Sequence, residues 1–327
     1  MNAIPITAIT AISTLALTCN AAAPASAQAQ TAASRPLRII VPYTAGSSSD
    51  VRGRIVAQAL AAQLEQPVII DNRPGIAGAD ILAKATPDGQ TTGFLNATVL
   101  ATATLLSSTL PYDPDRDYTA VALISNSPEV LVTDAKLNLN SVAELIAHAK
   151  ANPGKLNFGS AGATSLTRLA MELFKIEAGV NIVHVPYKGI GLAINDTIGG
   201  RVQTLISDLS GVQPFIRSGA LKALAVTSAR RIPLLPEVPT TAEAGLPKVL
   251  SDNLTGLMAP IATPVPALRR LHDAVVVALK KPAVVQQLTN QGVIPTPASA
   301  DEFRKLVRDE RARWAPIIKA HGIRADG

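Results

Sequence analysis

Two runs of small and hydroxyl residues follow apolar segments, and they are the part of the sequence best suited to bind a ligand. The first, YTAGSSSD, occupies residues 43–50, between the apolar segment 37–41 and the amphipathic segment 49–64. A turn that joins a strand to a helix presents backbone N–H groups, and the helix N-terminus adds partial positive charge, so anions bind there. Helix capping by serine or aspartate would also explain the pattern. The side chains that we expect at the ligand are Tyr43, Ser47, Ser48, Ser49 and Asp50.

The second run, FGSAGATS, occupies residues 158–165 and again precedes an amphipathic segment. Two such turns facing each other across a cleft would suit a ligand with two carboxylates. The run also resembles the Gly-x-Ser-x-Gly turn of serine hydrolases, but Phe158 stands where the first glycine is required, and His184 is expected to be a core histidine. A serine esterase is therefore the weaker alternative, and we expect no enzyme activity. The expected ligand-binding residues here are Ser160, Gly162 and Thr164.

Other polar residues stand at the ends of expected strands. Ligands of open parallel sheets bind beyond the carboxyl ends of the strands, so these positions share one edge. They are Asn96 after segment 91–95, Tyr187 and Lys188 after segment 183–185, and Asp208 after segment 202–206. For Tyr187 and Lys188, an ordinary exposed loop is the alternative.

Metal binding is not expected. The triplet Asp113, Asp115 and Asp117 resembles the start of a calcium loop, but Tyr118 stands at the position that requires glycine. We interpret it as a polar turn. The sequence also lacks a His-Glu-x-x-His motif, so no metal and no cofactor are predicted.

Segments typical of strands and helices alternate from Leu37 onward, which predicts an α/β architecture with parallel sheets. The expected strands are 37–41, 68–70, 91–95, 120–124, 130–133, 156–158, 183–185, 202–206 and 221–226. The expected helices are 49–64, 141–152, 164–179 and one that begins at a capping box at Ser299. Extended stretches at 119–133 and 253–260 would carry the chain twice between two lobes. Lobe 1 would contain 35–128 plus 254–327 and lobe 2 would contain 129–253, which predicts a hinged clamp.

Composition excludes several classes of protein. The 327 residues are 47% hydrophobic and 17% charged, which excludes a disordered chain, and a single cysteine excludes a disulfide scaffold. Aromatic residues make up 3%, too few for a surface that stacks unpaired bases, so no nucleic-acid partner is expected. The net charge of +6 indicates an anionic ligand. With few rings available, we expect the polar turns to supply the specificity.

The N-terminal segment is interpreted as a secretory signal peptide. No charged residue precedes Arg35, residues 4–17 are apolar, and Ala25 and Ala27 form a small-x-small cleavage pattern, although a basic start is missing. We expect removal of residues 1–27 by cleavage after Ala27, which also removes Cys19, and a periplasmic protein. A membrane anchor and a lipid-modified Cys19 are the alternatives.

Several short motifs, each weak alone, occur in order along the whole mature chain. They are RIIVPY at 38–43, VIIDNRPG at 68–75, ATPDG at 85–89, FGSAG at 158–162, VPYKG at 185–189, GGRV at 199–202, ALAVTS at 223–228 and PEVPT at 236–240. In this combination the sequence resembles the Bug-type (Bordetella uptake gene) periplasmic solute receptors of tripartite tricarboxylate transporters.

The resemblance implies a type II periplasmic-binding-protein fold, in which two crossing strands join two α/β lobes and a ligand cleft lies between them. It implies a monomer that closes around a small organic anion and delivers it to the membrane permease components of a tripartite tricarboxylate transporter. The anion would be a di- or tricarboxylate, an acidic amino acid or an aromatic acid. A ligand sensor for a membrane signalling partner is the alternative.

The resemblance also assigns ligand-binding roles to the two turns and to Asp208. The chain departs from the family pattern at the residue after the second turn, where the common histidine is Arg168. Because a guanidinium binds a carboxylate in bidentate fashion, we hypothesise that Arg168 contacts a second carboxylate. A solvent-facing helix residue is the alternative.

Overall fold

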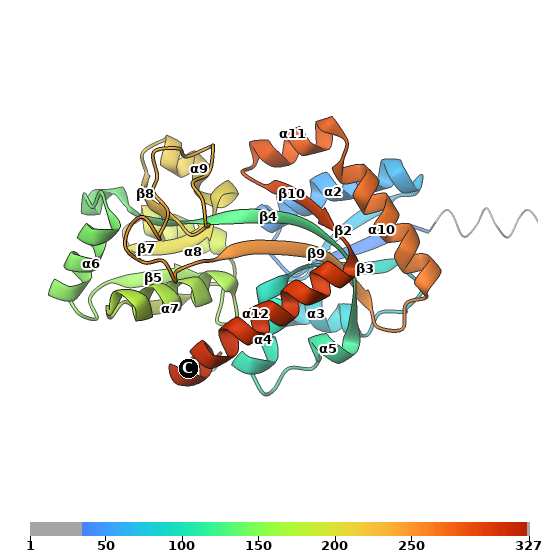
Figure 1. Cartoon of the computed structure of the whole chain (residues 1–327), viewed down its shortest axis with the longest axis horizontal. Coiled ribbons are helices and arrows are strands. Elements are labelled where there is room, and N and C mark those ends of the chain that lie inside the picture. The colour runs from blue at the N-terminus through green and yellow to red at the C-terminus, as the bar shows by residue number, and fades with distance from the viewer. Residues whose placement is uncertain (1–34, 326–327) are drawn as a thin grey trace, which may run out of the picture. The chain divides into compact units, whose positions relative to one another are not determined.

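The computed structural model describes residues 35–325, in which ten strands pair into one hydrogen-bonded sheet (Figure 1). They are β1 (Leu37–Val41), β2 (Val68–Asn72), β3 (Thr91–Asn96), β4 (Tyr118–Asp134), β5 (Asn157–Ser160), β6 (Val183–Pro186), β7 (Thr204–Asp208), β8 (Leu221–Val226), β9 (Asp252–Pro260) and β10 (Ile294–Ala298). The order is β2-β1-β3-β9-β4-β7-β5-β6, and β8 and β10 also pair with β4. The pairs β1–β2, β1–β3, β5–β6 and β5–β7 are parallel, which confirms the predicted α/β class.

Helices connect these strands, and most begin at the side chains that cap them. They are α2 (Ser48–Leu64), α3 (Ile76–Ala83), α4 (Ala97–Leu106), α5 (Pro114–Asp117), the 3-10 helix η1 (Ala135–Leu137), α6 (Val142–Ala151), α7 (Leu166–Ala178), α8 (Ile190–Ile198), α9 (Leu209–Arg217), α10 (Val265–Leu279), α11 (Pro282–Asn290) and α12 (Ala300–Ala320). The hydroxyls of Ser47, Ser141 and Ser165 cap α2, α6 and α7, and Ser299 forms the predicted capping box at α12. Capping therefore fixes where the turns end and the helices begin.

Strand β4 is shared between two sets of strands, and Figure 1 shows it running beside β9. Its first part, from Tyr118 to Pro128, pairs with β9, and its last part, from Glu129 to Asp134, pairs with β7 or β8. The partners change between Pro128 and Glu129, where the sequence analysis placed its lobe boundary. The two-lobe division and its hinge stay predictions, since the described residues 35–325 lie in one compact unit.

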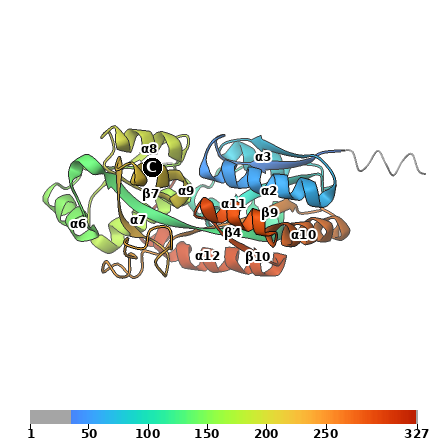
Figure 2. The same cartoon turned by 90° about the horizontal axis from the view of Figure 1, so that it is seen from above.

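Apolar side chains from the helices bury both sets of strands. One cluster joins β1 and α2 to α10 and α11, which lie beside α2 in Figure 2. A second joins β5, α6 and α7, and it also contains Trp314, Ile318 and Ile323 from the C-terminal part of the chain. Trp314 is fully buried there. The segment 254–327 therefore does not pack solely with lobe 1, to which the sequence analysis assigned it.

Candidate ligand-binding site

A cavity of about 560 Å³ is lined by the turns that follow β1, β5 and β6. This volume lies in the range of small-molecule sites. The predicted residues that line it are Tyr43, Ser47, Ser48, Ser49, Asn96, Gly162, Thr164, Tyr187 and Lys188. The other predicted residues, Asp50, Ser160, Arg168 and Asp208, are buried and do not line the cavity. The structure thus brings most of the predicted residues together and places the remainder in a supporting layer.

The turn after β1 is held in shape by Asp50. Its carboxylate accepts hydrogen bonds from the backbone N–H of Gly46 at 2.8 Å, from Asn72 Nδ2 at 3.0 Å and from Arg54 Nε at 3.0 Å. Burial acts to raise the pKa of Asp50, but these hydrogen bonds prevail and lower the pKa below its ordinary value. Asp50 is therefore an ionised anchor of the turn.

The three serine hydroxyls of this turn bind groups of the protein itself. Ser47 Oγ accepts from the N–H of Asp50, Ser48 Oγ donates to Asp208 Oδ2 at 2.6 Å, and Ser49 Oγ accepts from Arg52 Nη2 at 3.0 Å. Within residues 35–325, the backbone N–H groups of Ser48 and Ser49 have no acceptor, as expected for the first turn of a helix. Backbone donors therefore remain available at the cavity wall.

Asp208, at the end of β7, is the centre of a buried polar network. It accepts from Ser48, forms an ion pair with Arg52 at 3.3 Å, and accepts from Asn253 Nδ2 at 2.9 Å. Asn253 in turn accepts from Asn96 Nδ2 at 2.6 Å. The network connects the N-terminal turn of α2 to β3, β7 and β9. Sequence reasoning missed Arg52 and Asn253, although an arginine on the apolar face of a helix was a usable signal for the first.

The turn after β5 repeats the arrangement of the first turn. Ser165 Oγ accepts from the N–H of Arg168 and so caps α7, which starts at Leu166, two residues later than the predicted start at Thr164. Gly162 has a φ of 137°, a conformation that side chains with a Cβ rarely adopt. The N–H groups of Ala163 and Thr164, both on the cavity wall, have no acceptor in the described part of the chain. Donors from the turn before a second helix thus reach the same cavity.

Ser160 and His184 form the one contact that would suit a serine hydrolase. His184 Nε2 lies 2.7 Å from Ser160 Oγ. Burial, with the charges of Arg168 and Lys175, lowers the pKa of His184 to about 4, so the ring is a weak base. No carboxylate among residues 35–325 hydrogen-bonds to the ring, and the Ser160 side chain is fully buried. The pair therefore lacks both the orienting acid and the access to a substrate that catalysis requires.

Arg168 is buried, with 7% of its surface exposed, so its interpretation as a solvent-facing residue is wrong. Its Nη1 donates to the carbonyl oxygen of Ala163 at 2.8 Å and to that of Arg324 at 2.6 Å. The guanidinium thus joins the β5–α7 turn to the C-terminal segment. Its contact with a ligand carboxylate stays a prediction.

The turn after β6 touches the turn after β1. Gly189 has a φ of 152°, and a Cβ at this position would lie 2.9 Å from Thr44 Oγ1. Only glycine allows this approach. Beside it, the hydroxyl of Tyr187 donates to Asp196 Oδ2 at 2.8 Å, and Lys188 is exposed. The turn after β6 thus packs against the side chain of Thr44 in the turn after β1.

An apolar wall completes the cavity. We use this name for Ile76, Ala79, Leu95, Leu100, Tyr112 and Tyr118. The rings of Tyr112 and Tyr118 lie 5.7 Å apart, and with Tyr43 and Tyr187 they bring all four tyrosines of the chain to this cavity. Four rings therefore line a cavity in which few rings were expected. Overall composition could not reveal that scarce aromatic residues gather at one place.

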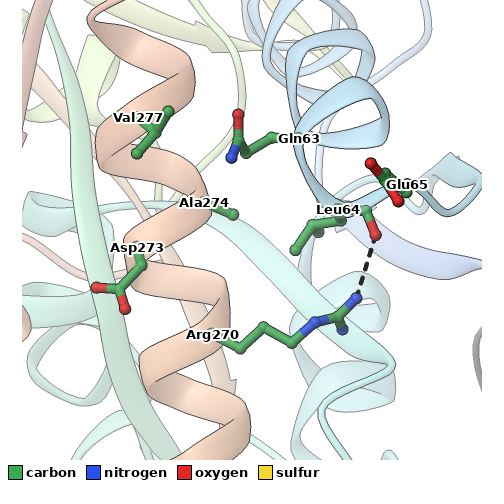
Figure 3. Close-up of a pocket in the computed structure, with 7 residues that line it drawn as sticks. All are labelled: Gln63, Leu64, Glu65, Arg270, Asp273, Ala274 and Val277. Atoms are coloured by element: carbon green, nitrogen blue, oxygen red, sulfur yellow. Dashed lines mark hydrogen bonds between the residues drawn. The ribbon is translucent and has the colours of Figure 1, made fainter.

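A second cavity, of about 360 Å³, lies between the end of α2 and α10 (Figure 3). Arg270 spans it and donates to the carbonyl oxygen of Leu64 at 3.4 Å and to Gln66 Oε1 at 2.7 Å. None of the residues predicted from the sequence lines this cavity. The guanidinium of Arg270 is already hydrogen-bonded to groups of the protein, so the first cavity remains the candidate site.

Residues 35–325 contain no group of three potential metal-ligating side chains. Among these residues, no helix combines the length and the apolar character that a membrane crossing requires. The predicted signal peptide, residues 1–27, lies outside the described residues.

The fold and the cavity between its turns define the class of periplasmic binding proteins, and solved structures share this architecture. An R. palustris protein solved with adipate has a TM-score of 0.85 and 34% identity, covering 89% of this chain and 98% of that one. MatC from Rhodopseudomonas palustris, solved with bound malate, has a TM-score of 0.82 and 30% identity, covering 87% of this chain and 99% of that one. The predicted periplasmic-binding-protein fold is confirmed.

The family follows from the sequence match. Residues 53–323 match the family described as tripartite tricarboxylate transporter family receptor. Protein BugT of Bordetella pertussis is 37% identical over 311 residues, which cover 94% of this chain and 95% of that protein. The chain therefore belongs to the tripartite tricarboxylate transporter receptor family, as the resemblance implied. It is a periplasmic-type solute receptor and not an enzyme.

Proposed function

We propose that the protein captures a small carboxylate in the 560 Å³ cavity and delivers it to the membrane permease components of a tripartite tricarboxylate transporter. The observation that carries this proposal is the convergence of two helix N-termini on one cavity. Backbone N–H groups of Ser48 and Ser49 at α2, and of Ala163 and Thr164 before α7, are donors without acceptors in the described chain.

Such donors suit a carboxylate better than a neutral or cationic ligand. A helix N-terminus carries about half a unit of positive charge, so two of them stabilise an anion without a buried cation. Asp50, Asp208 and Arg52 hold the donors in place from behind. The relatives solved with adipate and malate, both carboxylates, give independent support.

We further propose that the ligand closes a hinge between the two predicted lobes. β4 and β9 would be the hinge strands, because the partners of β4 change at Pro128 and Glu129. The protein would act as a monomer in the periplasm after cleavage at Ala27.

Thermal denaturation with a panel of carboxylates tests binding. A ligand at 100 times its Kd should stabilise the protein by about 2.7 kcal/mol and raise Tm by several degrees. Neutral amides of the same acids are the control and should cause no shift. If no carboxylate shifts Tm, the proposed function is wrong.

Two variants at one position isolate the contribution of a backbone donor. Ser48 is the first residue of α2, where proline fits a helix, and the extended backbone of the preceding Ser47 suits a residue before proline. Ser48→Ala removes only the hydroxyl, whereas Ser48→Pro removes the hydroxyl and the N–H. Because a hydrogen bond to a charged group contributes about 1.5–3 kcal/mol, Ser48→Pro should bind carboxylate roughly tenfold or more weakly than Ser48→Ala. Equal affinities, measured by calorimetry, would exclude a carboxylate at this donor.

A further inference from the structure

The apolar wall continues directly into the protein core. Ala79, Leu95, Leu100, Tyr112 and Tyr118 belong to one buried cluster with Phe303 and Met258. Ile76, the first residue of α3, extends this wall at the protein surface. A ligand that fills the cavity therefore meets a continuous hydrocarbon and ring surface on this side.

Two of the polar groups near this wall, the Tyr118 hydroxyl and the Asn96 amide, already have partners. The hydroxyl of Tyr118 donates to the carbonyl oxygen of Ala79 at 2.6 Å. The Asn96 amide accepts from the N–H of Val99 at 2.9 Å and donates to Asn253. Burial raises the pKa of Tyr112 to about 12, so its phenol is neutral. The wall therefore provides no charged partner for a ligand.

Cations for a second carboxylate are also scarce at the cavity. Among the lining residues within 35–325, Lys188 alone is a lysine or arginine, and it is exposed on the β6–α8 turn. The buried Arg52 binds Asp208, and Arg168 binds two backbone carbonyls. A second carboxylate against the apolar wall would lose its hydration without gaining an opposite charge, which is costly.

The size of the cavity leaves room for an apolar body. A cavity of about 150 Å³ already holds benzene. At about 560 Å³, this cavity exceeds the space that a carboxylate and a short polar chain would fill. Apolar surface buried against the wall gains roughly 0.8 kcal/mol per methylene, which is about a fourfold gain in affinity.

From these observations we infer that the preferred ligand is a monocarboxylate with an apolar body of five or more carbons, aliphatic or aromatic. The inference rests on the proposed function. The carboxylate binds the N–H donors of the two turns, and the body of the ligand lies against the apolar wall.

Calorimetric titration of the purified protein tests this preference for a monocarboxylate with an apolar body. Affinity should rise about fourfold per methylene from butyrate to octanoate until the cavity is filled. Hexanoate and adipate have the same number of carbons, so adipate differs only by its second carboxylate. Hexanoate should bind at least tenfold more tightly than adipate, and phenylacetate more tightly than malate or citrate.

A matched pair of variants locates the apolar body. Ile76 lines the cavity and is 43% exposed, and Ile69 on β2 is 50% exposed and does not line it. Ile76→Asn should weaken octanoate binding about fivefold or more, and by a larger factor than acetate binding, whereas Ile69→Asn should change neither. Both positions are exposed, so folding should be retained.

The outcomes separate the two proposals. Tight binding of adipate, malate or citrate with weak binding of hexanoate would overturn the monocarboxylate preference and leave the proposed function standing. An affinity that does not depend on chain length would also overturn the monocarboxylate preference and leave the proposed function standing. Failure of every carboxylate to bind would overturn the proposed function itself.

Discussion

The Ser160–His184 contact shows how the chemistry of a residue depends on its surroundings. A histidine within 2.7 Å of a serine hydroxyl is the geometry of a nucleophile and its base. Here burial and two neighbouring cations lower the pKa of His184 to about 4, and the serine is buried. We interpret the pair as a structural contact that ties β5 to β6.

The lowered pKa of His184 predicts a loss of stability in acid. Because the pKa of His184 is about 4 in the folded protein and near 6.5 when unfolded, the unfolded state binds more protons between these values. The stability due to neutral His184 is complete above pH 6.5 and is lost as the pH falls through 4. Since the ring is half-buried, we expect a loss of only about 1 kcal/mol. Urea denaturation at pH 7 and pH 4.5 measures it.

Two variants test whether the titration of His184 causes this loss of stability in acid. His184→Gln should reduce the difference in stability between pH 7 and pH 4.5. Ser160→Ala should preserve that difference, because burial and cationic neighbours, and not the serine, lower the pKa. If His184→Gln shows the full wild-type difference, His184 is not the group that titrates.

Site residues could be predicted from the sequence where a turn alone determines their position. Ser47, Ser48 and Ser49 precede a helix, and their place at the cavity follows from local pattern. Asp50 and Asp208 were predicted at the ligand, but neither lines the cavity. Asp50 binds mainly its own turn, whereas the partners of Asp208 come from distant segments. The Arg52–Asp208 ion pair joins residues that are 156 positions apart. Local periodicity carries no information about such a pair.

At the scale of elements, the helices α2, α6, α7 and α12 were predicted, but α4, α10 and α11 were not. The crossing 119–133 was expected to be extended, with strands at 120–124 and 130–133, and β4 is one continuous strand over it, because the polar residues between them also pair with β9. α4 escaped prediction because its sequence, ATVLATATLL, is almost uniformly apolar and shows no helical period. Pairing and burial override local pattern in both cases.

The packing of α12 on the sheet depends on a residue without a side chain. A Cβ at Gly256 on β9 would lie 2.2 Å from Phe303 Cε1 and 2.7 Å from the carbonyl oxygen of Ala122. Phe303 is fully buried, so it has no free space to move into. Gly256→Ala should lower the free energy of unfolding by about 1–3 kcal/mol, as overpacking does, measured by urea denaturation.

Gly191 on α8 provides the matched control. A Cβ there meets nothing within 4 Å, and alanine favours a helix by up to about 1 kcal/mol over glycine. Gly191→Ala should therefore be neutral or stabilising. Equal stability of the two variants would contradict the tight packing of Phe303 on β9.

At the scale of the whole molecule, the C-terminal segment connects parts of the chain that are distant in sequence. Arg168 on α7 donates to the carbonyl oxygen of Arg324, and the N–H of Ala325 donates to the carbonyl oxygen of Leu106 on α4 at 3.0 Å. Ala325 also lines the cavity. The segment after α12 is therefore placed to couple the two sets of strands at the ligand-binding site.

Arg168 can be tested as the residue that holds this segment. Arg168→Ala removes two charge-assisted hydrogen bonds, so we expect a loss of about 2 kcal/mol of unfolding free energy and faster amide hydrogen exchange at Ile323 and Ala325. Arg168→Lys keeps the charge without the planar fork and should recover only part of the loss. A structural role predicts that affinity falls by a similar factor for all carboxylates. A selective loss of dicarboxylate binding with unchanged exchange would instead show that Arg168 contacts a second carboxylate.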